Sequence, residues 1–339
     1  MKAAVVTRFG TTGALRIMEW PDPKESPGDV FVRTKVIGLN FADVFARMGY
    51  YPAIPRPPFI PGMELSGVVE RVGKEVKGFK RGDRVLAFPR LGAYAEYVSL
   101  PATHVVRMPR RMSFEDGAAL GVASLTAYHG LVTLAHIRPG EKLLLHAAAG
   151  GVGTAAVQLA KHLGAEVYAT ASSTKKLEVA KDQGADHLIN YRTDDFAEAI
   201  LTDTNGRGID VIMDSVGGRV FRKGWKLLAP MGRYVLYGFA AATGEQSVKK
   251  LRALRELASI PWIHPPSVVS KNVALAGFNL FFLMDKVDYL SRALRELLSL
   301  YEKKVLKPVI GAKLPFAEIA QGQALLQSRK SFGKVVVLL

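Results

Sequence analysis

A chain of 339 residues, 49% of them apolar, is long enough to bury a large core, and its length indicates two or three domains. It contains no cysteine, which excludes disulfide bonds, thiolate metal sites and a cysteine nucleophile. The formal net charge of +16 favours anionic partners, but the cations are dispersed and no nucleic-acid-binding motif is recognisable, so nucleic acid is not an expected partner. No run of about twenty apolar residues occurs, and charge interrupts the N-terminal segment too early for a signal peptide, so we expect a cytoplasmic protein.

The first third of the chain is expected to form a β-rich lobe, because short apolar segments alternate there with turns rich in glycine and proline. The predicted strands cover residues 3–7, 30–36, 66–72, 84–87 and 94–99, and the clearest turns lie at 27–29 and 80–83. This pattern favours a compact domain of short strands.

From Leu125 onward, predicted strands alternate with predicted helices, which is typical of a parallel sheet covered on both faces. The strands are expected at residues 142–146, 166–170, 187–190, 211–214, 233–238 and 273–277. A helix with one apolar stripe is predicted from Val287 to Tyr301, and a second helix is predicted after Pro315 because proline suits a first turn. Residues 334–339 are almost wholly apolar and are expected to form a buried strand. The predicted fold class is therefore α/β.

The segment 148–153 reads Ala-Ala-Gly-Gly-Val-Gly, which matches a dinucleotide-binding fingerprint at its second and third glycine positions. It follows the apolar segment 143–145 and precedes a helical pattern that begins at Thr154, which is the context that this fingerprint requires. Gly150 would let the main chain approach a pyrophosphate, Gly153 would let the helix pack on the strand, and the helix N-terminus would face the phosphates. A tight strand-to-helix turn without a ligand is the alternative, which the complete strand–helix–strand unit disfavours.

The choice of cofactor is made about twenty residues beyond the glycines, where NAD-binding domains place a carboxylate on the ribose. Residues 169–176 contain no carboxylate, whereas Ser172, Ser173, Lys175 and Lys176 offer hydroxyl and ammonium groups to a 2′-phosphate. An ordinary surface pair of lysines is the alternative, but cations at a helix start oppose the helix dipole unless an anion compensates them. The sequence therefore predicts NADP(H) as the cofactor.

A series of short motifs runs through nearly the whole chain in one order. They are Gly-Leu-Asn-Phe-Ala-Asp at 38–43, Arg-Met-Gly at 47–49, Pro-Gly-Met-Glu at 61–64, Gly-Asp-Arg-Val at 82–85, the stretch 140–161, Gly-Ala-Asp at 184–186 and Gly-Lys-Val-Val at 333–336. On these motifs the sequence resembles the medium-chain dehydrogenase/reductase superfamily, and specifically its zinc-free quinone oxidoreductase branch. Within this branch it looks most like the vesicle amine transport protein homologues, on residues 40–43, 213–214, 230–232 and 240–272.

The resemblance implies a GroES-like catalytic domain at 1–122, completed by a C-terminal return at 281–339. A Rossmann nucleotide-binding domain, with a doubly wound parallel sheet, would occupy residues 123–280 between them. The resemblance places the active site in the cleft between these lobes. It also implies a homodimer that forms through the edge strand predicted at 273–277, and an apolar edge strand does need a cover.

The zinc alcohol dehydrogenases of this superfamily hold their catalytic metal with a cysteine in the first motif and a His-Glu pair in the second. The resemblance places Asn40 and Met63 at the cysteine and histidine positions, and Glu64 alone cannot complete a tetrahedral site. The seven histidines are scattered, with no pair spaced for one helix face. We therefore predict no metal.

Without a Lewis acid, oxidation through an alkoxide is unfavourable, whereas hydride addition to a quinone or an α,β-unsaturated carbonyl compound needs only hydrogen-bond donors at a distant oxygen. The resemblance implies Asn40, Asp43 and Tyr51 as catalytic residues. Asn40 and Tyr51 can donate hydrogen bonds, and Tyr51 could relay a proton. Capping of a loop is the alternative role for Asn40, and anchoring of that loop is the alternative for Asp43. Many family members carry tyrosine where this chain has Phe45, which leaves an enone or unsaturated aldehyde as plausible a substrate as a quinone.

The predicted cofactor-binding residues combine the glycine loop with positions that the resemblance assigns. They are Ala149, Gly150, Gly151, Val152, Gly153, Ser172, Ser173, Lys176, Tyr191, Val216, Gly238, Phe239, Phe278, Arg329 and Lys334. In the NADPH-binding members of the family, a lysine, a tyrosine and an arginine placed like Lys176, Tyr191 and Arg329 contact the cofactor.

A second hypothesis is an NADPH-binding interaction protein that acts at a membrane surface with little turnover. It depends on residues 248–257, where apolar residues recur at helical spacing and cations occupy the other face. A cationic helix that covers the cleft or a dimer interface is the favoured interpretation, because the apolar stripe is narrow and short.

Overall fold

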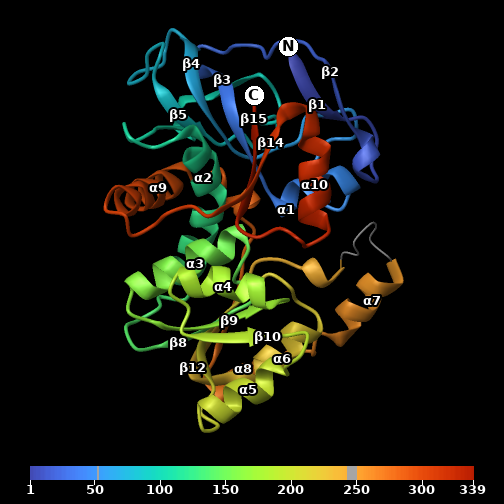
Figure 1. The fold of residues 1–339 in the computed structure, drawn as a ribbon, viewed down its shortest axis with the longest axis vertical. Coiled ribbons are helices and arrows are strands. Elements are labelled where there is room, and N and C mark those ends of the chain that lie inside the picture. The colour runs from blue at the N-terminus through green and yellow to red at the C-terminus, as the bar shows by residue number, and fades with distance from the viewer. Residues whose placement is uncertain (52, 243–249) are drawn as a thin grey trace. The chain divides into compact units, whose positions relative to one another are not determined.

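The computed structural model describes residues 1–51, 53–242 and 250–339 (Figure 1). The chain divides into two compact units. The first unit consists of Met1–Ala123, Phe281–Glu302 and Lys307–Leu339, and the second consists of Ser124–Leu280 and Lys303–Leu306. The predicted boundaries, after residues 122 and 280, lie within one residue of these divisions, and only the short piece 303–306 departs from the predicted C-terminal return.

The first unit is built on a seven-stranded sheet in the order β14-β15-β3-β4-β5-β7, with β6 paired to β3. Its strands are β3 (Asp29–Leu39), β4 (Leu65–Val72), β5 (Arg84–Ala87), β6 (Tyr97–Pro101), β7 (Val105–Arg107), β14 (Ile310–Pro315) and β15 (Lys334–Leu338). A separate antiparallel pair is formed by β1 (Lys2–Val6) and β2 (Leu15–Glu19). The C-terminal strand β15 runs antiparallel to β3 with Val335 opposite Leu39, which brings Lys334 to the end of β3.

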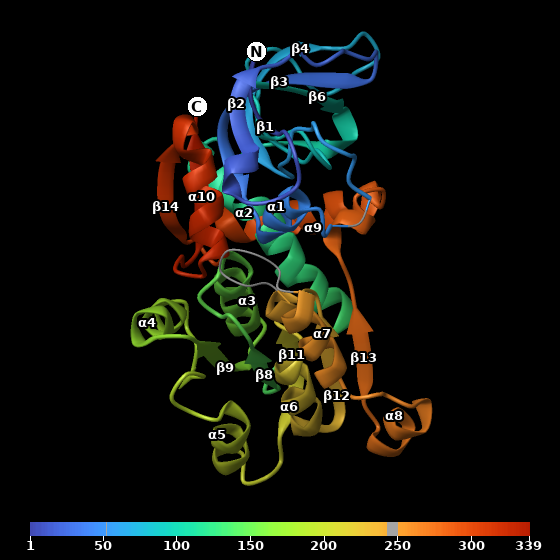
Figure 2. The same cartoon turned by 90° about the vertical axis from the view of Figure 1, so that its right-hand side faces the viewer.

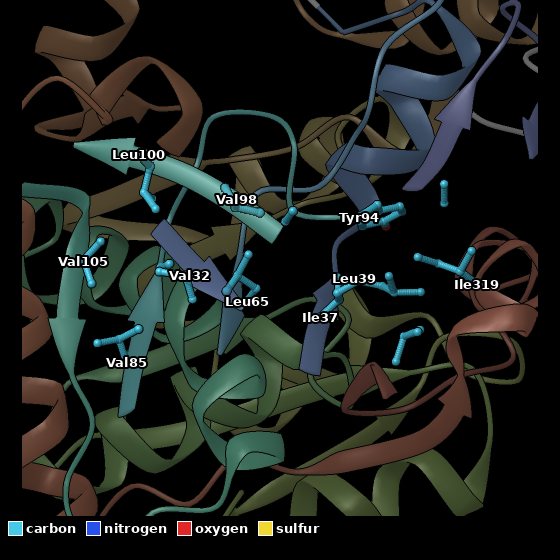
Figure 3. Close-up of a cluster of buried hydrophobic side chains, with 14 of the residues drawn as sticks. Val32, Ile37, Leu39, Leu65, Val85, Tyr94, Val98, Leu100, Val105 and Ile319 are labelled. Atoms are coloured by element: carbon cyan, nitrogen blue, oxygen red, sulfur yellow. The ribbon is translucent and has the colours of Figure 1, made fainter. Parts of the chain in front are cut away.

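The core of the first unit lies against this sheet (Figure 3). Alternate side chains of the strands point into it, as expected for strands with one buried face. The labelled core residues are Val32, Ile37, Leu39, Leu65, Val85, Tyr94, Val98, Leu100, Val105 and Ile319. Leu39 and Ile319 show how the C-terminal segment completes the core that the N-terminal strands begin.

The helices of the first unit are α1 (Phe41–Met48), α2 (Phe114–Tyr128), α9 (Val287–Glu302) and α10 (Ile319–Gln327), and α2 continues into the second unit. The helix α1 begins directly after β3 and ends at Gly49, whose φ of 79° is the left-handed conformation that glycine tolerates at a helix end. It packs against α10. Of the apolar stripe predicted for α9, Leu294, Leu297 and Leu298 are buried, with Ala293 beside them, whereas Val287, Leu290 and Tyr301 are only partly buried.

The second unit contains a six-stranded parallel sheet in the order β10-β9-β8-β11-β12-β13. Its strands are β8 (Lys142–Leu145), β9 (Glu166–Ala171), β10 (His187–Asn190), β11 (Ile209–Asp214), β12 (Leu228–Leu236) and β13 (Ala274–Gly277). The helices are α3 (Gly151–His162), α4 (Thr174–Asp182), α5 (Phe196–Asp203), α6 (Arg219–Leu227), α7 (Lys250–Ser259) and α8 (Pro265–Lys271). The strand order reverses between β8 and β11, as in doubly wound sheets, and β13 forms one edge (Figure 2).

Two of the predicted strands begin three or more residues away from the start that is observed. The strand predicted at 233–238 is β12, which starts five residues earlier at Leu228 and ends at Leu236. The prediction missed its start because Pro230, Met231 and Gly232 read as a turn, and Met231 does take a φ of 66° there. The strand predicted at 94–99 is β6, which runs from Tyr97 to Pro101.

One helical stretch in the described part of the chain, Phe114–Leu134, is long and apolar enough to cross a membrane by length and composition. Within its most apolar window, 78% is buried inside the protein. A buried core helix has the same composition, because its whole circumference contacts apolar neighbours.

Candidate functional site

The glycine loop forms a tight turn between β8 and α3. Ala147 has a φ of 55°, and the Gly150 amide donates to the Ala147 carbonyl at 2.9 Å, which closes the turn. Gly150 is the N-cap residue of α3 in an extended conformation. A Cβ atom at Gly153 would collide with the carbonyl oxygens of Ala147 and Ala148, whereas one at Gly150 would meet only Ala147 O, at 3.3 Å. The packing role predicted for Gly153 therefore has a direct steric cause.

The predicted cofactor-binding residues of the second unit all lie beyond the carboxyl ends of its parallel strands. Residues 149–153 follow β8, Ser172, Ser173 and Lys176 follow β9, Tyr191 follows β10, Val216 follows β11, Gly238 and Phe239 follow β12, and Phe278 follows β13. Carboxyl ends of parallel strands meet at one edge of the sheet, and the glycine loop lies where the strand order reverses. The structure therefore brings these residues to one edge, as a dinucleotide site requires.

The end of β9 carries the groups predicted to choose the cofactor. Ser173 is the N-cap residue of α4, and Lys176 is the third residue of that helix. The Tyr191 amide donates to the Ala171 carbonyl at 3.1 Å, so Tyr191 lies beside the end of β9. Its side chain is 48% exposed. These residues are close in the fold, although Tyr191 is distant from the serines in sequence.

The loop after β11 is held by a buried carboxylate that the sequence prediction missed. Asp214 accepts hydrogen bonds from the amides of Val216 and Gly217, at 2.6 and 3.1 Å, and from the Tyr234 hydroxyl at 2.7 Å. Burial, and then the charge of Asp214, raise the pKa of Tyr234 well above its usual range. Gly217 has a φ of 70°, and a Cβ atom there would collide with the ring of Phe239. Asp214 thus sets the path of the chain at Val216, and the only sequence signal is an aspartate that ends an apolar strand.

In the first unit, the side chain of Asn40 belongs to a buried polar cluster with Glu64 and Lys334. Asn40 Nδ2 donates to Glu64 Oε1 at 2.8 Å, and Lys334 Nζ donates to Asn40 Oδ1 at 2.9 Å. Lys334 Nζ also donates to Glu64 Oε1 at 2.6 Å and to the Leu39 carbonyl at 2.8 Å. The side chains of Lys334 and Glu64 are only 5% and 1% exposed. Asn40 also precedes α1 as its N-cap residue. Its predicted catalytic role stays a prediction.

Asp43 anchors the start of α1 from within the core. Its Oδ2 accepts from the Asn40 amide at 2.8 Å and from the Tyr94 hydroxyl at 2.9 Å. Burial raises the pKa of Asp43 to about 7, although both hydrogen bonds and the charge of Lys334 act to lower it. Asp43 is therefore close to equal populations of the neutral and charged forms near neutral pH.

A buried arginine in the same helix as Asp43 was also missed by the sequence prediction. Arg47 Nε donates to Gln323 Oε1 and Arg47 Nη2 to Gln327 Oε1, both at 2.6 Å, and Nη1 donates to the Gly10 carbonyl. Gln323 in turn donates to the Tyr94 hydroxyl at 3.4 Å. The guanidinium thus joins α1 to α10 through neutral acceptors.

Tyr51 lies apart from the other two predicted catalytic residues. Asn40 and Asp43 are at the start of α1, whereas Tyr51 follows its end, where the ring makes an edge contact with Phe281 at 5.3 Å between centroids. The structure therefore brings Asn40 and Asp43 into direct contact and places Tyr51 beyond the other end of the helix.

The positions of the zinc ligands in related enzymes hold residues with other chemistry here. Met63 is buried, and the amide of Asn40 is occupied by Glu64 and Lys334. Elsewhere in the described residues, Glu166, His187 and Asp203 have potential ligand atoms within 4.8 Å of one another. These groups already bond to one another and to Lys142 and Tyr168. The predicted lack of a metal stays a prediction.

The β-rich unit and the doubly wound unit with its glycine loop define a GroES-like domain combined with a Rossmann domain. Residues 26–110 match the family described as alcohol dehydrogenase GroES-like domain, and residues 151–286 match the family described as zinc-binding dehydrogenase. The synaptic vesicle membrane protein VAT-1 homolog of Rattus norvegicus is 38% identical over 346 residues, covering 100% of this chain and 84% of that protein. The corresponding Danio rerio protein is 37% identical over 338 residues, covering 99% of this chain and 69% of that protein.

Solved structures agree with this assignment. A quinone oxidoreductase of Pseudomonas syringae pv. Tomato DC3000 has a TM-score of 0.89 at 32% identity, over 100% of this chain and 99% of that one. Escherichia coli quinone oxidoreductase complexed with NADPH has a TM-score of 0.89 at 29% identity, over 100% of both chains. The chain belongs to the medium-chain dehydrogenase/reductase superfamily and is close to the VAT-1 homologues. The predicted family and fold are thereby confirmed.

Proposed function

We propose that the protein is an NADPH-dependent, zinc-independent oxidoreductase that transfers a hydride to a quinone or an α,β-unsaturated carbonyl compound. The observation that carries this proposal is the cluster around Asn40, which the resemblance places where zinc relatives have a ligand cysteine. Its side-chain amide bonds to the carboxylate of Glu64 and to the ammonium group of Lys334. Such a set cannot bind zinc with normal ligands, but its amide can donate a hydrogen bond to a substrate oxygen.

NADPH would bind at the carboxyl edge of the parallel sheet. The turn at Gly150 leaves room for a pyrophosphate, and the N-terminus of α3 faces it with a partial positive charge. Ser172, Ser173 and Lys176 would receive the 2′-phosphate beside Tyr191, because hydroxyl and ammonium groups stabilise an anion that a carboxylate would repel. The E. coli relative complexed with NADPH supports this choice. When bound, the cofactor supplies the hydride, and the chain supplies orientation and polar contacts.

The substrate carbonyl would accept a hydrogen bond from Asn40 Nδ2. One proton of this amide is donated to Glu64, and among the described residues the only other acceptor for it is the Gly38 carbonyl at 3.4 Å, which is a long contact. The neighbouring aromatic residues, Phe41 and Phe45, pack edge to face at 5.5 Å between centroids and offer no hydroxyl group. An apolar enone or unsaturated aldehyde therefore suits this surface as well as a quinone does.

A stopped-flow screen of NADPH oxidation against quinones, enones and unsaturated aldehydes tests the proposal. We expect turnover with at least one class, and about a tenfold to hundredfold lower kcat/KM in Asn40→Ala, with the Kd for NADPH unchanged. Phe45→Tyr is the matched variant, because it restores a hydroxyl group and should shift preference toward quinones. No turnover with any of these acceptors, in protein that binds NADPH, would overturn the proposed activity.

We further infer a homodimer formed by the edge strand β13. Among the residues that the structure describes, this strand pairs with β12 alone and ends the sheet, and Leu275 in it is 44% exposed. An unpaired apolar edge is a template for a second copy of the same strand. Light scattering should give twice the chain mass of 36.9 kDa for the wild type and a lower mass for Leu275→Lys. A monomeric wild type would refute this inference.

A membrane-surface role is the second candidate, and the exposed Trp262 is the observation that favours it. Its side chain is 84% exposed, between α7 and α8. Of the predicted cationic segment 248–257, residues 248 and 249 lie outside the described residues, and the others fall in α7. Within α7, Glu256 accepts from the Arg219 amide at 3.2 Å, so this helix is attached to α6. Sedimentation with anionic vesicles tests this candidate. Binding that persists at high salt and is abolished by Trp262→Ser would favour a membrane-surface role over an enzyme.

A further inference from the structure

We propose that Lys334 and Glu64 are positioning residues, which fix the side-chain amide of Asn40 in the one orientation that presents an N–H group to the substrate. This inference rests on the proposed hydride-transfer function, which makes Asn40 the hydrogen-bond donor. It assigns to Lys334 a role other than the contact with the cofactor that the sequence suggested.

The ammonium group of Lys334 has no proton left for a phosphate. An ammonium donates three hydrogen bonds. Lys334 Nζ makes three, to Leu39 O at 2.8 Å, to Asn40 Oδ1 at 2.9 Å and to Glu64 Oε1 at 2.6 Å. Since the side chain is 5% exposed, a phosphate could bind it only by breaking one of these bonds within the core.

The two charged groups determine which way the amide of Asn40 faces. An ammonium can only donate and an ionised carboxylate can only accept, whereas an amide presents one accepting and one donating end. Lys334 therefore selects Oδ1, and Glu64 selects Nδ2. A reversed amide would place its NH2 group against the ammonium and its oxygen against the carboxylate, with both contacts repulsive. Neutral partners could accept either orientation.

The remaining oxygen of Glu64 is also engaged, so the carboxylate cannot turn away. Glu64 Oε2 accepts from the Val122 amide in α2 at 2.7 Å. Two glycines make the room, since a Cβ atom would come within 2.8 Å of Glu64 Oε1 at Gly38 and within 2.9 Å of Glu64 Oε2 at Gly121. The carboxylate is thus held by α2, β15 and the start of α1 together.

This arrangement also bears on the strength of the donor. The ammonium lies 2.9 Å from the amide oxygen and polarises the amide, which makes the N–H group a better hydrogen-bond donor. In the part of the chain that the structure describes, the second N–H group of Asn40 has only the long contact to Gly38 O, at 3.4 Å. A donor that is fixed before the substrate binds stabilises charge on the substrate oxygen without the cost of reorientation.

The test uses the charge-neutral double variant Lys334→Met/Glu64→Gln, because a single change would leave an unpaired charge in the core. We expect at least a tenfold loss of kcat/KM in the otherwise intact protein and no further loss when the pair of changes is made in Asn40→Ala. The Kd for NADPH should be unchanged in both. The matched control is Lys313→Met/Glu115→Gln, which removes a more exposed Lys–Glu pair, 3.1 Å apart, from the same unit and should leave kcat/KM unchanged.

Three results of these binding and kinetic measurements would overturn the inference. A higher Kd for NADPH in the double variant would show that Lys334 contacts the cofactor. An equal loss of kcat/KM with and without Asn40 would show a general structural effect, as would a loss in the control of the same size.

A readout independent of turnover keeps this inference separate from the proposed function. The protein would be labelled with ¹⁵N-asparagine, and the side-chain resonances of Asn40 would be assigned by their loss in Asn40→Ala. In the wild type, these resonances should show two distinct amide protons that exchange slowly with solvent. They should exchange faster in Lys334→Met/Glu64→Gln. Fast exchange in the wild type would refute the positioning role, whereas slow exchange without turnover would refute only the hydride-transfer proposal.

Discussion

Replacement of Asp43 by asparagine isolates the effect of one buried carboxyl group on stability. In the folded protein, burial raises the pKa of Asp43 from the ordinary 3.8 to about 7. Asn is the matched substitution, because its amide oxygen can accept from the Asn40 amide and the Tyr94 hydroxyl as Oδ2 does. The variant therefore resembles the protonated carboxyl group at every pH.

The sign of the pH dependence follows from the raised pKa. Below about pH 4 the carboxyl group is protonated in both folded and unfolded chains, and it imposes no penalty. As the pH rises to about 7, the unfolded chain loses this proton while the folded protein retains it, so stability is lost over this window. The total loss is about 4 kcal/mol, of which about 2–3 kcal/mol falls between pH 5 and pH 8.

Urea unfolding of wild type and Asp43→Asn at pH 5 and pH 8 measures this difference. The free energy of unfolding of the variant, relative to the wild type, should rise by about 2–3 kcal/mol from pH 5 to pH 8. Asp288→Asn, at an exposed aspartate in the first turn of α9, is the control and should show no such change. If the difference between Asp43→Asn and wild type is the same at both pH values, the carboxyl group is not held neutral by burial and the reasoning is wrong.

The other predictions concern the glycine loop, the cofactor, the buried arginine and the metal. Gly153→Ala should destabilise the protein and abolish NADPH binding, because the added Cβ has no space, whereas Gly150→Ala should weaken NADPH binding with little change in Tm. Equal effects on Tm would contradict a packing role for Gly153 and a phosphate-binding role for Gly150. Lys176→Ala should weaken NADPH binding about tenfold to a hundredfold and leave NADH binding unchanged. Lys181→Ala, in the last turn of the same helix, is the control. An equal loss for both cofactors would contradict a contact between Lys176 and the 2′-phosphate. Arg47→Met should lower the free energy of unfolding by about 2–6 kcal/mol, because it leaves two buried glutamine oxygens without a donor, and a loss under 1 kcal/mol in urea unfolding would refute this. Elemental analysis of the purified protein should find no stoichiometric zinc, and activity lost to chelators would show that the ligand positions were misjudged.

The second unit could be predicted largely from its sequence because its signals are local. Apolar segments bounded by glycine and polar residues gave the strand at 187–190 with the bounds that β10 has. The glycine loop was predictable because the steric demand at Gly153 arises within one strand–turn–helix unit. Prediction failed at the start of β12, where Pro230 and Gly232 resemble a turn although the neighbouring strand β11 continues the pairing through an irregular register.

The polar clusters of the first unit were not predictable, because their members are far apart in sequence. Lys334 and Glu64 are separated by 270 residues, and Arg47 and Gln327 by 280. No spacing rule relates such residues, and they meet only because β15 pairs with β3 and α10 packs on α1. A weak signal existed in Lys334, a lone cation at the start of an apolar strand, since a buried charge requires a partner.

Under the proposed function, the charges around Asn40 would suit a negative charge that is delocalised over the substrate. Glu64 and Lys334 form a buried pair whose charges cancel, and below about pH 7 Asp43 is neutral as well. On this proposal, Asn40 would donate from surroundings with no net charge, which would be enough for an enolate or a reduced quinone, whose charge is spread over several atoms. An alkoxide concentrates its charge on one oxygen and needs a metal or an unpaired cation to match it. Ionisation of Asp43 would add a negative charge 2.8 Å from the backbone amide nitrogen of Asn40, so under the proposed function a rise in pH through about 7 would also oppose hydride transfer.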